Sequence, residues 1–394
     1  MIVNSLKVQN YKLLKDLEIE KLGQINLIVG KNNSGKSTVL ECLRILSSNG
    51  NPSIINEIVE EHDEQIMMQN KNEFEEDDYI SIYEGLFTDR KFSEDGKPIY
   101  IGSLSKNFYV EINRVFYEET EEEQKDEKGN VILIRNRKIH EITEFENSSD
   151  FAQLIRIISH QNPNRPILFK YKDTPLFLKR KTASSLEAVK PTPISYIPTQ
   201  FLSMDLLASL WDQAVLTSYF DNVRKFLKII SKDFEDIAFI KVNNPRRRTP
   251  YHSNLASIQR TGIVKLNNLE SPIPLNRMGD GVLRILQLVL GIFPATNGLL
   301  LIDEFENGLH FSVQEKIWKL IFELASELNI QVFATTHSWD CVEAFTHAAN
   351  QSDKEAVLAR IGKSILPMDN GKTIATVFDK NSLNNLTQSS VELR

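Results

Sequence analysis

The chain has 394 residues, of which 41% are hydrophobic and 25% charged, a balance typical of a soluble globular protein with two or three domains. Its net charge of −7 argues against a protein that coats nucleic acid with its whole surface, because that mode of binding needs a basic excess. The longest apolar stretch, Val282–Phe293, contains Arg284 and Gln287, so it is too short and too polar to cross a bilayer.

The cysteines and the first residues indicate the cellular compartment. The N-terminal segment lacks the basic, apolar and small-residue order of a signal peptide. Cys42 and Cys341 have no paired spacing, so we expect neither a disulfide framework nor a zinc site. The sequence therefore predicts a cytoplasmic protein with no membrane association.

The N-terminal segment predicts a pair of strands, then a third strand and a helix. Residues 2–11 and 14–22 alternate apolar and polar positions, as antiparallel strands do. Ile25–Val29 is an apolar run typical of a buried strand, and Thr38–Leu46 has the periodicity of a helix.

The loop between that strand and that helix fits the pattern Gly-x-x-x-x-Gly-Lys-Ser, with Gly30, Gly35, Lys36 and Ser37 in the fixed positions. Glycines let backbone N–H groups converge on phosphates, the lysine reaches the β and γ oxygens, and the serine hydroxyl can bind Mg²⁺. An ordinary glycine-rich turn is the alternative, but the flanking strand and helix favour a phosphate loop for ATP and Mg²⁺. The residues predicted to contact the nucleotide here are Gly30, Asn32, Asn33, Ser34, Gly35, Lys36, Ser37 and Thr38.

An acid-rich insertion, residues 51–189, separates two halves of the nucleotide fold. Two alternating segments, residues 107–119 and 131–142, flank an acidic stretch and predict a hairpin with a charged tip. We therefore expect an ATPase core made of residues 1–50 and 190–394, with a separate insertion domain.

Beyond the insertion, residues 193–200 predict a strand that returns the chain to the core. Apolar residues at helical spacing predict a helical lobe over about residues 203–240. No internal repeat or sustained heptad register appears, so a long coiled coil is not supported. The adjacent arginines Arg246–Arg248 are either a solvated loop or a contact for phosphate or a partner.

Three later motifs carry polar residues at the ends of apolar segments. An apolar strand precedes Asp303 and Glu304, where an aspartate can hold Mg²⁺ through its water shell and a glutamate can polarise an attacking water. His337 ends another buried strand and would reach the γ-phosphate if the two strands are neighbours. A Gly-Asp-Gly turn at residues 279–281 leads into an apolar helix. Each motif alone is weak evidence.

Together, the order of these motifs resembles the ABC-type ATPases of the RecF, Rad50 and overcoming-lysogenisation-defect kind, and most closely the compact AAA15/AAA21 ATPases. The resemblance covers residues 1–50 and 190–394, and we identify no resemblance for the insertion. It implies an α/β fold: an ABC-type P-loop NTPase core, in which helices flank a mixed sheet, with a large α+β insertion.

The resemblance also implies roles for individual residues. Lys36 and Ser37 belong to Walker A, and Asp303 and Glu304 to Walker B. The implied catalytic residues are Glu304 and His337, the implied signature residues that contact a nucleotide are Gly279, Asp280 and Gly281, and the implied metal ligands are Ser37, Asp303 and Gln200. The signature departs from the transporter form Leu-Ser-Gly-Gly-Gln, and the insertion lengthens the spacing from Walker A to Gln200.

A phosphate loop leaves the γ-phosphate open, so the resemblance implies a head-to-tail homodimer, or a higher homo-oligomer, in which one chain's signature caps the nucleotide of the other.

Relatives of this kind imply a regulatory ATPase that acts as sensor or scaffold beside a separate effector nuclease in bacterial anti-phage defence. The alternative is a DNA-repair ATPase of the RecF or SMC type that binds DNA directly. The acidic charge and the lack of a coiled-coil register favour the first hypothesis. No Asp-x-Asp nuclease motif follows His337.

Overall fold

The computed structural model describes residues 3–62, 76–93, 95–125, 131–140, 152–170, 192–230, 232–242, 259–364, 369 and 371–383. The arginine run Arg246–Arg248 and the hairpin tip beyond Lys125 lie outside these residues, so the predictions made for them stay open. Among the described helices, none combines the length and the apolar character needed to cross a bilayer.

The core is a six-stranded mixed sheet in the order β16-β15-β3-β14-β13-β9. Neighbouring strands from β15 to β9 run parallel, and β16 is antiparallel to β15. The strands are β3 (Ile25–Val29), β9 (Ile194–Ile197), β13 (Leu299–Ile302), β14 (Gln331–Thr336), β15 (Ala356–Lys363) and β16 (Thr373–Asp379). The predicted mixed sheet is confirmed.

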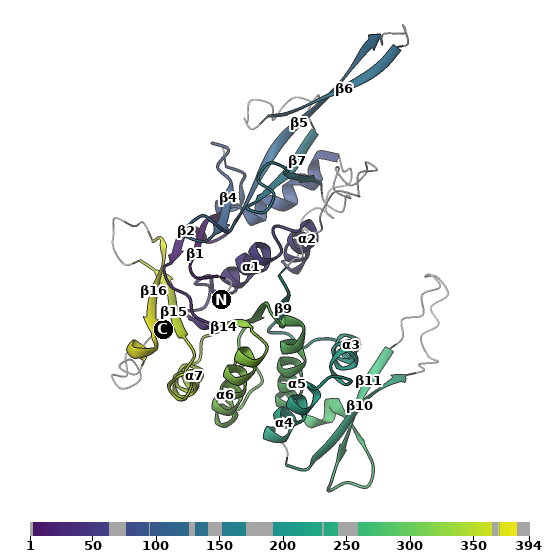
Figure 1. The fold of residues 1–394 in the computed structure, drawn as a ribbon, viewed down its shortest axis with the longest axis vertical. Helices are drawn as coiled ribbons and strands as arrows, with labels where there is room; N and C mark the ends of the chain where they lie inside the picture. The colour runs from purple at the N-terminus through teal and green to yellow at the C-terminus, as the bar shows by residue number, and fades with distance from the viewer. Residues whose placement is uncertain are drawn as a thin grey trace.

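Helices cover both faces of this sheet (Figure 1). They are α1 (Lys36–Ser47) on one face and α5 (Asp280–Ile292), α6 (Phe311–Glu327) and α7 (Trp339–Gln351) on the other. The alternation of side chains along β13 explains this layering: Leu299 and Leu301 share a core with α1, whereas Leu300 and Ile302 share one with α5, α6 and α7. Strands buried on both faces account for the continuous apolar runs in the sequence.

A second, antiparallel sheet lies on the far side of α1, with the order β2-β1-β4-β5-β7-β8 and β6 paired to β5. Its strands are β1 (Leu6–Tyr11), β2 (Leu14–Ile19), β4 (Ile99–Gly102), β5 (Tyr109–Lys125), β6 (Val131–His140), β7 (Ala152–Ser159) and β8 (Ile167–Phe169). The predicted hairpin is confirmed, because β6 pairs antiparallel with residues 116–125 of β5, and the two strands project from the body (Figure 1).

The insertion is joined to the core through this sheet. β4 follows the predicted boundary at residue 51, yet it pairs with β1 of the core. Between residue 51 and β4 the chain forms α2 (Pro52–Glu61) and the 3-10 segments η2 (Glu76–Leu86) and η3 (Thr88–Arg90). The hydrogen-bonded sheet thus crosses the predicted boundary between core and insertion. The division into two domains remains a prediction.

The lobe after β9 contains strands as well as helices. α3 (Met204–Ala214) and α4 (Phe220–Ile230) confirm its helical part. From Phe234, however, the chain forms β10 (Phe234–Val242), which pairs with β11 (Gln259–Leu266), and β11 pairs with β12 (Ile273–Pro274). The prediction of helix to about residue 240 is therefore wrong at its end. β-branched and aromatic residues such as Ile237 and Phe239 favour the strand.

Four parallel strands bring the predicted motifs to one edge of the sheet. Val29 lies opposite Thr336, and Ile302 lies opposite both Ala334 and Ile197. The segments that follow β3, β13, β14 and β9 therefore leave the sheet side by side. These segments begin with the phosphate loop, Asp303, His337 and the turn that contains Thr199.

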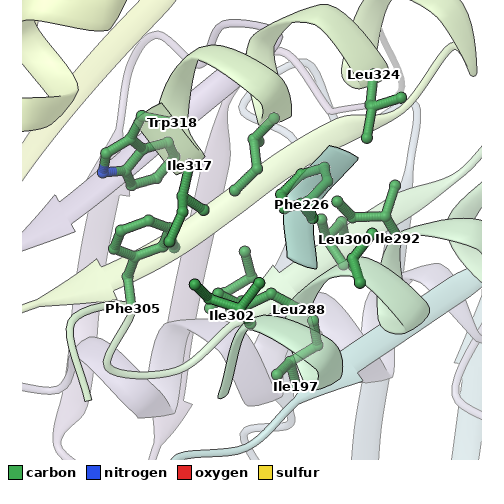
Figure 2. Close-up of a cluster of buried hydrophobic side chains, with 14 of the residues drawn as sticks. Ile197, Phe226, Leu288, Ile292, Leu300, Ile302, Phe305, Ile317, Trp318 and Leu324 are labelled. Carbon is green, nitrogen blue, oxygen red and sulfur yellow. The ribbon is translucent and has the colours of Figure 1, made fainter. Parts of the chain in front are cut away.

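A buried aromatic pair supports the strand that carries Asp303. The rings of Phe305 and Trp318 stack with their centroids 4.1 Å apart and their planes 17° apart. Figure 2 shows this pair beside Ile317 and Ile302, between α6 and the sheet. Both rings are fully buried, so α6 fixes the backbone immediately after Glu304.

Replacing Trp318 by alanine tests this support. We expect Trp318→Ala to lower the free energy of unfolding by about 3–5 kcal/mol, because it leaves a cavity against Phe305. Urea unfolding measures the change. As a matched control, Phe311→Ala removes a 62% exposed ring from the same helix and should change stability by less than about 0.5 kcal/mol. Equal effects of the two substitutions would contradict the packing account.

Candidate nucleotide site

The phosphate loop needs glycine at two positions for steric reasons. Gly35 has φ 99°, a left-handed conformation that side chains disfavour. At Gly30, φ is 156°, and an added Cβ would lie 2.2 Å from the carbonyl oxygen of Ile361 on β15. The loop therefore passes close to the neighbouring strand before α1 begins.

Lys36 lies inside this loop. Its Nζ donates hydrogen bonds to the carbonyl oxygens of Gly30 (2.9 Å) and Lys31 (3.0 Å). Burial lowers the pKa of the Lys36 ammonium, and the nearby carboxylates of Glu304 and Asp303 oppose that effect. The N-cap residue of α1 is Gly35, which has no side chain to cap the helix, so this end suits a phosphate ligand. This arrangement fits the predicted phosphate site.

The carboxylate of Asp303 accepts hydrogen bonds from hydroxyl groups on three other segments. Ser37 Oγ lies 3.0 and 3.1 Å from its two oxygens, and Thr335 Oγ1 donates to Oδ1 at 2.6 Å. Thr199 Oγ1 donates to Oδ2 at 3.3 Å. The predicted pair Ser37 and Asp303 is therefore brought together. Both are hard oxygen donors of the kind that Mg²⁺ prefers, and a bound Mg²⁺ would neutralise phosphate charge beside them.

Gln200 is placed differently from the other predicted metal ligands. It is exposed, and its main-chain carbonyl accepts a hydrogen bond from Gln287 Nε2 at 3.1 Å. Its neighbour Thr199 is the residue of this turn that contacts Asp303. A metal-binding role for Gln200 remains a prediction that would need its side chain to turn toward the carboxylate.

Glu304 has a strained backbone that its neighbours hold in place. Its φ of 44° is left-handed, which is uncommon for a residue with a side chain. Its N–H donates to Thr335 Oγ1 at 2.9 Å, and its carbonyl accepts from Arg284 Nη2 at 2.8 Å. The side chain is 38% exposed, so the carboxylate can reach water at the edge of the sheet. This geometry suits the predicted role of polarising an attacking water.

Arg284 connects the signature helix to the catalytic strand. From α5 its guanidinium donates to the carbonyl oxygens of Pro198 and Asp303, both at 2.7 Å, in addition to Glu304. Burial lowers the pKa of Arg284 to about 10, although the carboxylates of Asp303 and Glu306 favour its charge. The sequence pattern indicates such a contact. Arg284 and Gln287 are polar residues in an apolar helix, and their spacing of three residues puts them on one face of it.

His337 lies beside two carboxylates. Its Nδ1 is 3.1 Å from Glu306 Oε1 and 3.9 Å from Glu304 Oε1. The predicted catalytic pair is therefore adjacent, and the condition set by the sequence, that β13 and β14 are neighbours, holds. Glu306, Thr199 and Thr335 could not be predicted from the sequence, because nothing in the local pattern identifies their partners.

The signature turn opens to solvent. Gly279 has φ 84°, and a Cβ built there would meet no atom within 4 Å in the part of the chain that the structure describes. Gly279 and Asp280 are exposed, Gly281 is half-buried, and α5 has no side-chain cap. The first N–H groups of α5 are therefore accessible to a ligand.

A buried carboxylate, Glu41, ties α1 to the N-terminal sheet. Its Oε2 accepts from Tyr11 OH (2.8 Å) and Lys12 Nζ (2.7 Å), and its Oε1 lies 2.6 Å from His62 Nε2. Burial raises the pKa of the Glu41 carboxyl, but the contacts with His62 and Lys12 outweigh burial and lower the pKa to about 2 from 4.5.

This lowered pKa predicts a pH dependence of stability. The folded pKa is below the unfolded one, so the stabilisation is present above pH 4.5 and is lost as the pH falls toward 2. Between these values we expect the wild type to lose up to about 3 kcal/mol more unfolding free energy than Glu41→Gln. Urea unfolding at several pH values measures both. Parallel pH profiles would contradict a charged Glu41.

Glu304→Gln tests the catalytic carboxylate. The amide keeps the shape but cannot accept a proton from water, so hydrolysis should fall on the order of 10²- to 10⁴-fold while ATP still binds. Lys36→Ala is the contrasting variant, because it removes the charge that faces the β and γ oxygens and should abolish ATP affinity. Steady-state turnover and equilibrium binding separate the two effects. Near-normal turnover of Glu304→Gln would refute the assignment.

Comparison with known proteins agrees with these motifs. Residues 1–342 match the family model described as AAA ATPase domain, AAA_15. An ATP/GTP phosphatase of Helicobacter pylori is 22% identical over 377 residues, which cover 89% of this chain and 90% of that protein. An uncharacterised protein of Methanocaldococcus jannaschii is 40% identical over 47 residues, or 12% of this chain and 22% of that protein.

Among solved structures, the SMC head domain from Thermotoga maritima is 10% identical, with a TM-score of 0.41, over 96% of this chain and 99% of that chain. An SMC head bound to the C-winged helix domain of ScpA is 14% identical, with a TM-score of 0.45, over 98% and 99%. The family match confirms the predicted relationship and activity, and it covers well over half of the chain. The chain belongs to the AAA ATPase domain family, AAA_15, and is an ATPase with a P-loop in a mixed α/β core.

Proposed function

We propose that this ATPase works as an ATP-dependent head-to-tail homodimer that regulates a separate effector. In the dimer, Gly279, Asp280 and Gly281 of one chain cap the ATP bound at Lys36 and Ser37 of the other. Two composite sites then form, and hydrolysis by Glu304 and His337, with Mg²⁺ at Ser37 and Asp303, releases the chains.

The observation that carries this proposal is the open N-terminus of α5. Its first N–H groups have no side-chain cap, and the helix dipole places partial positive charge there, which favours a phosphate. Arg284 holds the same helix against the backbone of Asp303 and Glu304 in its own chain. These donors are thus fixed in direction and accessible to the γ-phosphate on a second chain.

The biological part of the proposal rests on the resemblance of the motifs. We propose a sensor or scaffold subunit that acts with a nuclease in bacterial anti-phage defence. The net charge of −7 supports a protein effector over a direct DNA clamp. Co-purification of the products of neighbouring genes tests the partnership. Tight, salt-dependent binding of duplex DNA by the ATPase alone would favour the DNA-repair alternative instead.

Mixing two inactive variants tests the shared sites. Lys36→Ala cannot hold ATP, and Gly281→Arg fills the space that the partner's phosphate must occupy. In a mixed dimer, the intact loop of the Gly281→Arg chain meets the intact signature of the Lys36→Ala chain, so one whole site forms. Random pairing should restore about a quarter of the wild-type rate in a turnover assay.

A second glycine supplies the matched control. Gly362 on β15 has no atom within 4 Å of an added Cβ among the described residues, whereas an added Cβ at Gly281 would lie 3.3 Å from the carbonyl oxygen of Gly308. Gly362→Arg therefore tests the effect of an added arginine away from the signature turn, and it should keep wild-type turnover. If each chain completed its own site, mixing the two inactive variants would restore no activity at any ratio. That result would refute the head-to-tail arrangement.

A further inference from the structure

Glu306 is an acidic residue that the predicted site does not use. It follows Phe305 in the turn between β13 and α6, and its side chain is only 11% exposed. Burying a carboxylate is unfavourable unless its oxygens are compensated. Its position therefore calls for an explanation in terms of its neighbours.

One oxygen of Glu306 makes two contacts with His337. Oε1 accepts the main-chain N–H of His337 at 3.0 Å and lies 3.1 Å from Nδ1 of the same residue. A single acceptor that engages both the backbone and the ring restricts the ring to one orientation. Nδ1 is thus the ring nitrogen on the side of Glu306, and Nε2 is the nitrogen on the other side of the ring.

The other oxygen is not compensated within the part of the chain that the structure describes. Oε2 of Glu306 is buried and has no hydrogen-bond partner there. An unpaired buried oxygen lowers stability, so Glu306 is not explained by its contribution to the fold. A buried carboxylate that lowers stability and lies beside a predicted catalytic residue is typical of a functional constraint.

The same ring nitrogen also lies near the predicted catalytic base. Nδ1 of His337 is 3.9 Å from Glu304 Oε1, farther than from Glu306. Without Glu306, the imidazole could turn and hydrogen-bond to the carboxylate of Glu304. That carboxylate must instead accept a hydrogen bond from the attacking water. Glu306 thus holds the histidine away from Glu304.

We propose that Glu306 is a positioning residue for ATP hydrolysis, which acts on the reaction through its contacts with His337. It fixes the ring so that Nε2 faces the γ-phosphate, and it keeps the carboxylate of Glu304 free for water. This inference rests on the proposed role of His337.

A double-mutant cycle tests whether Glu306 acts through His337. We measure kcat and KM for the wild type, Glu306→Ala, His337→Ala and the double variant. Glu306→Ala should lower kcat at least roughly tenfold and leave KM within about twofold, because ATP binding does not involve it. In the His337→Ala background, the same change should alter kcat by less than about twofold.

Two further variants separate position from charge. Glu306→Gln keeps an oxygen that can accept from both the N–H and Nδ1, so it should retain most of the wild-type kcat. Glu306→Asp keeps the charge but is one methylene too short, so its kcat should fall as in Glu306→Ala. The Asp variant also provides a second cycle with His337→Ala if the alanine variant fails to fold, as judged by ATP affinity and thermal melting.

The outcomes are distinguishable. An equal loss of kcat from Glu306→Ala with and without His337 would overturn the proposal, because Glu306 would then act independently. Wild-type kcat in Glu306→Asp would also overturn it, since charge alone would suffice. Wild-type kcat in His337→Ala would refute the role of His337 itself and the inference with it, without touching the ATP site at Lys36.

Discussion

The carboxylate of Asp303 is the centre on which the rest of the site depends. It is mostly buried, and it accepts hydrogen bonds from the hydroxyls of Ser37, Thr335 and Thr199. Ser37 follows β3, Thr335 is near the end of β14, and Thr199 follows β9. A buried carboxylate needs such donors, and only a parallel sheet with β3, β14, β13 and β9 in this order supplies them at one edge. The sheet therefore places the phosphate loop and Asp303 side by side.

From this centre the contacts extend to the signature helix. Arg284 binds the carbonyl oxygens of Asp303 and Glu304, and it is buried on α5, three residues after Gly281. Thr335 holds the N–H of the same glutamate in its strained conformation. Arg284 and Thr335 thus connect the helix that follows the signature turn to the backbone of Glu304.

Much of this arrangement follows from the sequence, because strand, loop and helix patterns are local. The glycines of the phosphate loop, the apolar run before Asp303 and the strand before His337 each predict their own element. Thr199 shows where local patterns end: it is 104 residues from Asp303, and only the pairing of β9 with β13 brings them together. The resemblance to the family pointed to the adjacent Gln200 instead. Likewise, Phe234–Val242 has apolar residues that fit a helix or a strand, and pairing with β11 decides between them.

In the proposed dimer ATP links two chains, and the molar mass of Glu304→Gln tests this most directly. This variant should bind ATP without consuming it, so the complex accumulates. Light scattering after size exclusion should give one chain mass without nucleotide and twice that mass with ATP and Mg²⁺. An unchanged monomer mass in both states, over a wide range of protein concentrations, would contradict the composite site.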